Sequence, residues 1–84
     1  MQLSVEISLY PLSEQYLDVI ESFVERLAGY ENISVHTNTI STHIFGDFAS
    51  VMAILTKEFE YMYQQDLPQL FVCKFINRDL KPHG

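Results

Sequence analysis

The chain has 84 residues, a length that suits one domain with one hydrophobic core. Hydrophobic residues make up 48% of it, and with six Phe and five Tyr they can fill a compact core, so a disordered chain is not expected. The formal net charge of −6 disfavours nucleic acid and anionic membrane surfaces as partners, because both are bound by clustered Lys and Arg.

Cysteine content and hydropathy indicate the compartment. A single cysteine, Cys73, excludes an internal disulfide and fits a reducing environment. No apolar run approaches the length of a membrane helix, and the first residues alternate apolar and polar side chains, unlike a signal peptide. We therefore expect a cytoplasmic protein.

The chain opens with the pattern of a strand and then of a helix. Apolar and polar residues alternate over residues 3–9, the period of a strand with one buried face. Tyr10-Pro11-Leu12 ends this strand, because proline cannot donate to a ladder. Ser13 is the expected N-cap of a helix with an apolar stripe over residues 16–27, and Gly29 is its expected end.

The stretch Ile33–Gly46 predicts two short strands that form a hairpin, because apolar and polar residues alternate on both sides of a polar turn. We place that turn at Asn38-Thr39. The resulting pairs, which face the helices, are Thr37 with Ile40, Val35 with Thr42 and Ile33 with Ile44. The side chains expected on the opposite face are His36, Ser41, His43 and Phe45.

A second helix and a last strand complete the chain. Asp47 is the expected N-cap of the helix, and Pro68 marks the break after it. The buried stripe of this helix is expected to comprise Phe48, Val51, Met52, Leu55, Phe59 and Met62. The last strand spans Leu70–Asn77, with Lys74 on the open face because burying an unpaired lysine is costly. That choice sends Phe71, Cys73 and Phe75 into the core.

The order strand, helix, strand, strand, helix, strand predicts a ferredoxin-like α+β sandwich, given right-handed crossovers. Its antiparallel four-stranded sheet has the order 4-1-3-2, with both helices on one face. We expect one domain at residues 1–80 and a short tail at residues 81–84, with fraying from Arg78 onward. Glu6 and Lys74 on neighbouring strands are expected to pair.

Polar side chains converge at one edge of this predicted sheet. Tyr10-Pro11-Leu12 and both sides of the hairpin turn should meet there, although they are far apart in sequence. Hydroxyls, an amide and a phenol beside apolar residues suit a small heterocycle with several hydrogen-bonding atoms. Asn and Thr at a hairpin turn also stabilise the turn itself, so that alternative stays open.

Other polar residues predict neither a metal site nor an enzyme. His36 and His43 share one face and Cys73 lies on the other, so no three-ligand metal site is expected. Glu6 with either histidine could act as an acid–base pair, but no nucleophile with a supporting third group accompanies it. Cys73 is expected to be a core residue and not a reactive thiol. Phe45 on the open face indicates packing against another subunit.

Residues 5–12 read Val-Glu-Ile-Ser-Leu-Tyr-Pro-Leu, and residues 35–42 read Val-His-Thr-Asn-Thr-Ile-Ser-Thr. Phe45-Gly46-Asp47 and Val51-Met52 follow them. In this order and spacing, these segments resemble the YkoF-like thiamine/hydroxymethylpyrimidine-binding family over nearly the whole chain, from Leu3 to Leu80.

The resemblance implies a ferredoxin-like module without catalysis that binds the pyrimidine part of thiamine or its precursor. The residues that match the binding positions of the family are Glu6, Ser8, Tyr10, Thr37, Asn38, Ser41 and Thr42. Glu6 would accept a hydrogen bond from the pyrimidine amine, and the side chain of Tyr10 would pack against the pyrimidine ring. Strand parity turns Thr37 and Thr42 toward the helices, so a pocket between sheet and helices would favour these two residues.

The resemblance also implies repeats or oligomers that pack sheet against sheet. Because this chain has one module, a homodimer or higher homo-oligomer would replace the second copy.

We therefore expect a non-enzymatic binder of thiamine or hydroxymethylpyrimidine that acts as a carrier, buffer or sensor in thiamine uptake or salvage. Its partner is this small molecule, which is its ligand, and no cofactor or metal is expected. The acidic balance favours unphosphorylated ligands. The alternative is a structural module that assembles through its open sheet face without a small-molecule ligand.

Overall fold

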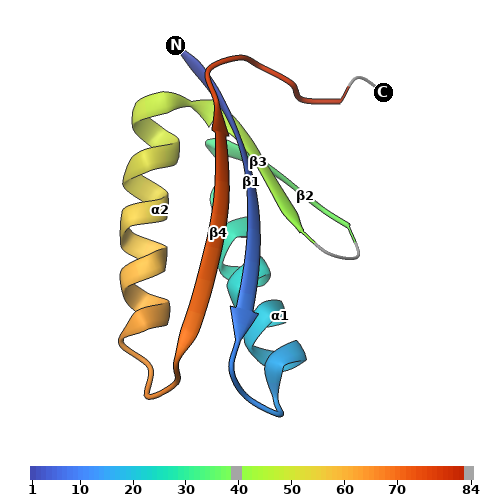
Figure 1. Ribbon diagram of the computed structural model, residues 1–84. Coiled ribbons are helices and arrows are strands. Elements are labelled where there is room, and N and C mark those ends of the chain that lie inside the picture. The colour runs from blue at the N-terminus through green and yellow to red at the C-terminus, as the bar shows by residue number, and fades with distance from the viewer. Residues whose placement is uncertain (39–40, 83–84) are drawn as a thin grey trace.

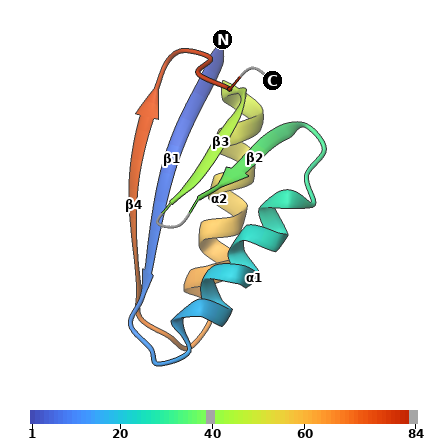
Figure 2. The ribbon, with the colours of Figure 1, turned by 90° about the vertical axis from the view of Figure 1, so that its right-hand side faces the viewer.

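A computed structural model describes residues 1–38 and 41–82 of the chain. The elements follow in the order β1 (Gln2–Pro11), α1 (Tyr16–Ala28), β2 (Ile33–Thr37), β3 (Thr42–Asp47), α2 (Phe48–Tyr63) and β4 (Gln69–Ile76). The strands form one antiparallel sheet in the order β2-β3-β1-β4, and both helices cover the same face of it (Figures 1 and 2). This confirms the predicted ferredoxin-like α+β fold and its strand order.

The core lies between the sheet and the two helices. Leu3, Val5 and Ile7 of β1 point into it and are at most 3% exposed. The buried apolar residues of the helices are Phe23, Leu27, Val51, Ile54, Leu55 and Met62. Complete burial of one such side chain contributes about 1.5–3 kcal/mol, so this layer is the main source of stability.

Most of the predicted core positions are confirmed, with one exception at the start of α2 and one on the edge strand β4. Phe71 and Cys73 of β4 pack against the core, and Lys74 lies on the opposite face beside Glu6, as predicted. The expected burial of Phe48 and Phe75 is wrong, since these side chains are 43% and 49% exposed. Phe48 opens α2, and Phe75 lies on the edge strand, so neither is covered on every side.

The hairpin has a register two residues away from the predicted one. Thr37 pairs with Thr42, and Val35 pairs with Ile44, so four residues of the sequence separate the two strands, and not the two of the predicted turn at Asn38-Thr39. Thr39 was expected in the turn, and Ile40 was expected to pair with Thr37. Both residues lie outside the described part of the chain. A shift by two residues leaves every side chain on its predicted face, because the period of a strand is two.

The two helices begin differently. α1 starts at Tyr16, and the predicted N-cap Ser13 instead accepts a hydrogen bond from the Gln15 N–H at 3.1 Å in the preceding turn. The prediction for Ser13 is therefore wrong. Asp47 is confirmed as the N-cap of α2, and its carboxylate accepts from the Ser50 N–H at 3.3 Å.

The segment after β4 crosses β1 near the N-terminus and runs toward the side of β2 and β3 (Figure 1). The Ser4 hydroxyl donates to the carbonyl of Arg78 at 2.7 Å and accepts from the N–H of Leu80 at 2.9 Å. Ser4 is 3% exposed, and Phe45 is 7% exposed although it faces away from the helices. The fraying expected from Arg78 onward is therefore wrong as far as Leu80.

One buried carboxylate joins the two helices. Glu58 of α2 is 1% exposed, and it accepts hydrogen bonds from Arg26 Nε at 2.5 Å and from the Tyr30 hydroxyl at 2.6 Å. The ring of Tyr61 covers the Arg26 guanidinium at 3.5 Å. Burial by itself raises the pKa of Glu58, but the hydrogen bonds from Arg26 and Tyr30 outweigh it, and the pKa lies below its ordinary value of 4.5.

Replacing Glu58 with Ala is expected to lower the free energy of unfolding by about 2–3 kcal/mol, because Arg26 and Tyr30 lose their shared partner. Urea unfolding measures this effect, and Glu60→Ala, at an exposed position of the same helix, is the matched control. Because the pKa of Glu58 is lowered in the folded state, its contribution is complete above about pH 4.5 and is lost as the pH falls through the folded value. The difference in unfolding free energy between the unmodified chain and the Glu58→Ala variant should therefore shrink at acid pH. A difference that stays constant with pH would show that the charge of Glu58 does not stabilise the fold.

Candidate functional site

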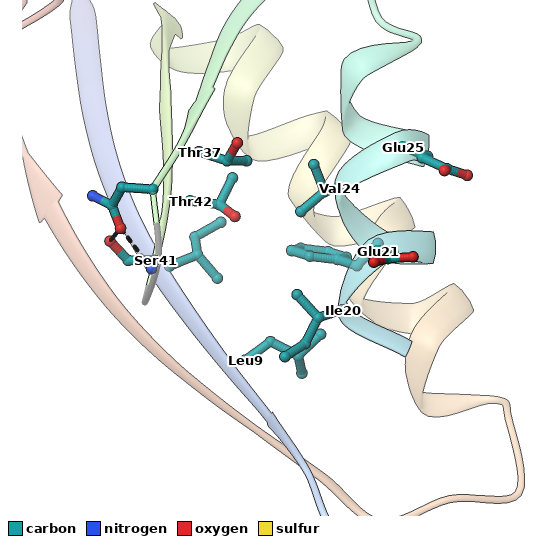
Figure 3. A pocket seen from close by; sticks show the side chains of 11 residues that line it. Leu9, Ile20, Glu21, Val24, Glu25, Thr37, Ser41 and Thr42 are labelled. Atoms are coloured by element: carbon teal, nitrogen blue, oxygen red, sulfur yellow. Dashed lines mark hydrogen bonds between the residues drawn. The ribbon is translucent and has the colours of Figure 1, made fainter. Parts of the chain in front are cut away.

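A cavity of about 360 Å³ lies between α1 and the adjoining ends of β2 and β3, on the helix side of the sheet (Figure 3). Apolar side chains of β1 and α1 form much of its wall. They are Ile7, Leu9, Ile20, Phe23 and Val24. A cavity of this volume, with apolar walls and few polar groups, suits a small heterocyclic molecule.

The strand side of the cavity supplies hydroxyl groups. Thr37, at the end of β2, and Thr42, at the start of β3, point toward α1 (Figure 3). Thr42 is 6% exposed. Within residues 1–38 and 41–82, neither hydroxyl takes part in a hydrogen bond. Both hydroxyls can therefore donate to and accept from a molecule in the cavity.

Asn38 and Ser41 close the loop beside these threonines. The Asn38 side-chain oxygen accepts from the Ser41 N–H at 2.9 Å and from the Ser41 hydroxyl at 3.2 Å, as the dashed lines beside Ser41 indicate in Figure 3. The Asn38 N–H donates to the Ser41 carbonyl at 3.0 Å. Asn38 thus stabilises the turn, as the alternative interpretation of the sequence held, and it also lines the cavity.

The other three residues named by the resemblance lie elsewhere. Glu6, Ser8 and Tyr10 alternate along β1 with the residues that face the helices, so they belong to the open face of the sheet. Tyr10 is 52% exposed and pairs with Leu70, three residues beyond the last pair between β1 and β3. Tyr10-Pro11-Leu12 do not line the cavity with Thr37, Asn38, Ser41 and Thr42, so the structure does not group them with these residues there.

Glu6 is the centre of a polar network on the open face. Its Oε2 lies 3.2 Å from His43 Nε2, and its Oε1 lies 3.5 Å from Lys74 Nζ, which confirms the predicted pairing with Lys74. The hydrogen bond with His43 is the largest cause that holds the pKa of Glu6 below 4.5. The Ser41 hydroxyl lies 3.4 Å from Glu6 Oε2, so Ser41 joins this network to the cavity.

A hydrolase triad uses the same residue types as Ser41, His43 and Glu6, but the geometry of these three differs from that of a triad. In a triad, the hydroxyl and the carboxylate contact different nitrogens of the imidazole. Here the Ser41 hydroxyl and the Glu6 carboxylate both lie 3.2 Å from His43 Nε2. One nitrogen cannot accept the serine proton and donate to the carboxylate at the same time, so this arrangement is not a proton relay.

The remaining sequence candidates take structural positions. Among residues 1–38 and 41–82, no three His, Cys, Asp or Glu side chains are grouped to hold a metal ion. Burial raises the pKa of the Cys73 thiol, which keeps it protonated and less reactive. In the same part of the chain, no helix is both long and apolar enough to cross a membrane.

Two acidic residues of the cavity are absent from the sequence-based set of candidates. Glu21 and Glu25 of α1 line it opposite the strands. Both lie outside the apolar stripe of α1, so the periodicity of the helix gives no reason to place them at a cavity. Finding them required the position of α1 relative to the hairpin, which no local pattern contains.

A family model described as the YKOF-related family matches residues 2–73. None of the curated proteins is significantly similar to the chain.

Solved structures share the fold at low sequence identity. The SP2199 protein of Streptococcus pneumoniae has a TM-score of 0.83 and 22% identity, covering 95% of this chain and 90% of that one. TM0486 of Thermotoga maritima, described as a proposed thiamine biosynthesis/salvage protein, has a TM-score of 0.78 and 18% identity, covering 96% and 85%. The hypothetical protein MJ1052 of Methanocaldococcus jannascii has a TM-score of 0.74 and 19% identity, covering 96% and 84%.

Asn38→Ala is expected to speed hydrogen exchange of the Ser41 amide about fivefold, because the acceptor of that N–H is lost and such a bond is worth about 1 kcal/mol. NMR exchange rates measure the change. Asn38→Asp keeps an acceptor oxygen in the same place and is the control, for which the rate should stay close to that of the unmodified chain. Equal rates in all three proteins would show that other contacts hold the loop.

Proposed function

This chain belongs to the YKOF-related family, and from that membership we propose that it binds thiamine or its hydroxymethylpyrimidine moiety without catalysing a reaction. The observation that carries the proposal is the cavity beside α1, which four of the seven residues matched by the resemblance line. They are Thr37, Asn38, Ser41 and Thr42. The description of TM0486 as a proposed thiamine biosynthesis/salvage protein supports the same ligand.

The chemistry of the cavity fits an aminopyrimidine. The ring needs apolar walls, which Ile7, Leu9 and Phe23 offer. Its amine donates and its ring nitrogens accept, and the hydroxyls of Thr37 and Thr42 can serve either need. In this arrangement Glu6 does not contact the ligand and acts on the site through Ser41.

The role we infer is that of a carrier, buffer or sensor in thiamine uptake or salvage, without a cofactor or a metal. The cytoplasm suits it, because the lone Cys73 fits a reducing compartment. Unphosphorylated ligands fit best, since none of the described residues that line the cavity is a Lys or Arg that could bind a phosphate.

A thermal-shift titration with thiamine and with hydroxymethylpyrimidine tests the proposal. Ligand at one hundred times its Kd adds about 2.7 kcal/mol to native stability, which raises the Tm of a chain this short by several degrees. Thr42→Val keeps the shape of the side chain and should weaken binding about tenfold, since one hydrogen bond is lost. The matched control Thr56→Val, on the exposed side of α2, should bind as the unmodified chain does.

The same titration distinguishes the two faces of the sheet. Ser8→Ala alters the open face and should leave binding unchanged. If Ser8→Ala weakens binding and Thr42→Val does not, the ligand occupies the open face. If neither compound raises the Tm, the proposed function is wrong.

A second proposal concerns assembly through the open face, as a homodimer or higher homo-oligomer. Tyr10, Val72 and Ile76 lie on this face and are 52%, 49% and 41% exposed. Apolar side chains gathered on one sheet face support packing against a second copy of the chain. If the chain assembles but binds neither ligand, it is the structural module that the sequence analysis gives as the alternative.

Val72→Glu is expected to lower the mass of the assembly, because it introduces a charge among the exposed apolar side chains of this face. Sedimentation equilibrium measures the mass. Leu17→Glu, at an exposed position of α1 that is 58% exposed, is the control and should leave the mass unchanged. A monomeric unmodified chain at every concentration would contradict the proposal.

A further inference from the structure

Two glutamates lie at the rim of the cavity on successive turns of α1, and the side chain of Glu25 extends from the helix toward solvent (Figure 3). Glu21 and Glu25 are both exposed, and neither forms an ion pair within residues 1–38 and 41–82. The nearest basic residue in sequence, Arg26, is bound to Glu58, and the described residues that line the cavity include no Lys or Arg. A ligand that enters therefore meets a negative potential that no neighbouring cation offsets.

This pair opposes the stability of its own helix. Like charges four residues apart on a helix repel each other, and Glu21 and Glu25 have this spacing. Glu25 also lies in the last turn of α1, which ends at Ala28, where the helix dipole favours positive charge. Local features that oppose an otherwise consistent fold are expected at functional sites.

A second feature of the same cavity points to a ligand. Thr42 is 6% exposed, points into the cavity, and has no hydrogen-bond partner for its hydroxyl within the described residues. Figure 3 shows Thr42 on the strand side and Glu21 and Glu25 on the helix side. A ligand with a hydrogen-bonding ring and a charged group would thus place the ring against the strands and the charge near α1 and solvent.

We propose that Glu21 and Glu25 make the cavity selective for a positively charged ligand, so that the whole thiamine cation binds more tightly than the neutral hydroxymethylpyrimidine. This inference rests on the proposed function and specifies which of its two ligands the site prefers. The thiazolium ring of thiamine carries a permanent positive charge, which the pyrimidine moiety lacks. Thiamine diphosphate adds negative charge beside the two carboxylates and binds most weakly.

The expected size of the effect follows from the exposure of both carboxylates. In water, a unit charge several ångströms from a carboxylate changes Kd by about threefold, so the two together account for about tenfold at low ionic strength. Salt reduces this contribution, because the groups are separated by a distance comparable with the screening length.

Isothermal titration calorimetry of the full chain with thiamine and with hydroxymethylpyrimidine tests the selection. In the Glu21→Gln/Glu25→Gln variant, the Kd for thiamine should rise about tenfold, while the Kd for hydroxymethylpyrimidine stays the same. The Glu14→Gln/Glu31→Gln variant is the matched control, since it makes the same change in net charge at exposed positions away from the cavity, and neither Kd should change. Added salt should raise the Kd for thiamine alone.

The Tm of the unliganded proteins is an independent readout. The Glu21→Gln/Glu25→Gln variant should melt about 1–4 °C higher than the unmodified chain, because the repulsion within α1 is removed. A higher Tm together with weaker thiamine binding would show that the helix gives up stability at the site, an effect that misfolding cannot mimic.

The outcomes separate the selection from the proposed function. In one outcome, both ligands bind the unmodified chain, and the Glu21→Gln/Glu25→Gln variant either binds thiamine equally tightly or loses the same affinity for both ligands. The proposed selectivity for the cation is then wrong, and the proposed function stands. Tighter binding of hydroxymethylpyrimidine than of thiamine by the unmodified chain overturns the selection as well. If the unmodified chain binds neither compound, the proposed function fails and the selection falls with it.

Discussion

The alternation of side chains along β1 is the constraint on which the rest of the structure depends. β1 pairs with β3 on one side and β4 on the other, so its two faces set the faces of the whole sheet. Leu3, Val5 and Ile7 build the core, while the residues between them meet the C-terminal segment and the polar network. A slip of one residue would exchange these sets and bury Glu6 among apolar side chains, at a cost that no partner there could offset.

At the hairpin end, one residue takes part in contacts on both faces of the sheet. Ser41 lines the cavity on the helix side, and its hydroxyl reaches Glu6 and His43 on the open face. Its N–H and hydroxyl are also held by Asn38. A change in the packing of the open face can therefore alter the position of the cavity edge through a few hydrogen bonds.

The acidic residues of the chain fall into distinct electrostatic situations. Glu58 is buried and stabilised by Arg26 and Tyr30, and Glu6 is partly exposed and paired with His43 and Lys74. The carboxylates on α1 beside the cavity have no such partners within the described residues. The same side-chain chemistry thus ties helices together in one place and leaves a negative potential at a cavity in another, and the difference lies in which cations the fold brings near.

By itself, the sequence determined the fold class, the strand order, the face of each strand residue and the resemblance to the family that the match to residues 2–73 confirms. These features follow from the period of apolar residues and the order of the elements, which are local properties of the chain. Only the tertiary structure decided the hairpin register, the path of the segment after β4, the burial of Glu58 and the grouping of Thr37 and Thr42 with the acidic side of α1. Each of these depends on the distance between elements remote in sequence, and a local pattern carries no information about such distances.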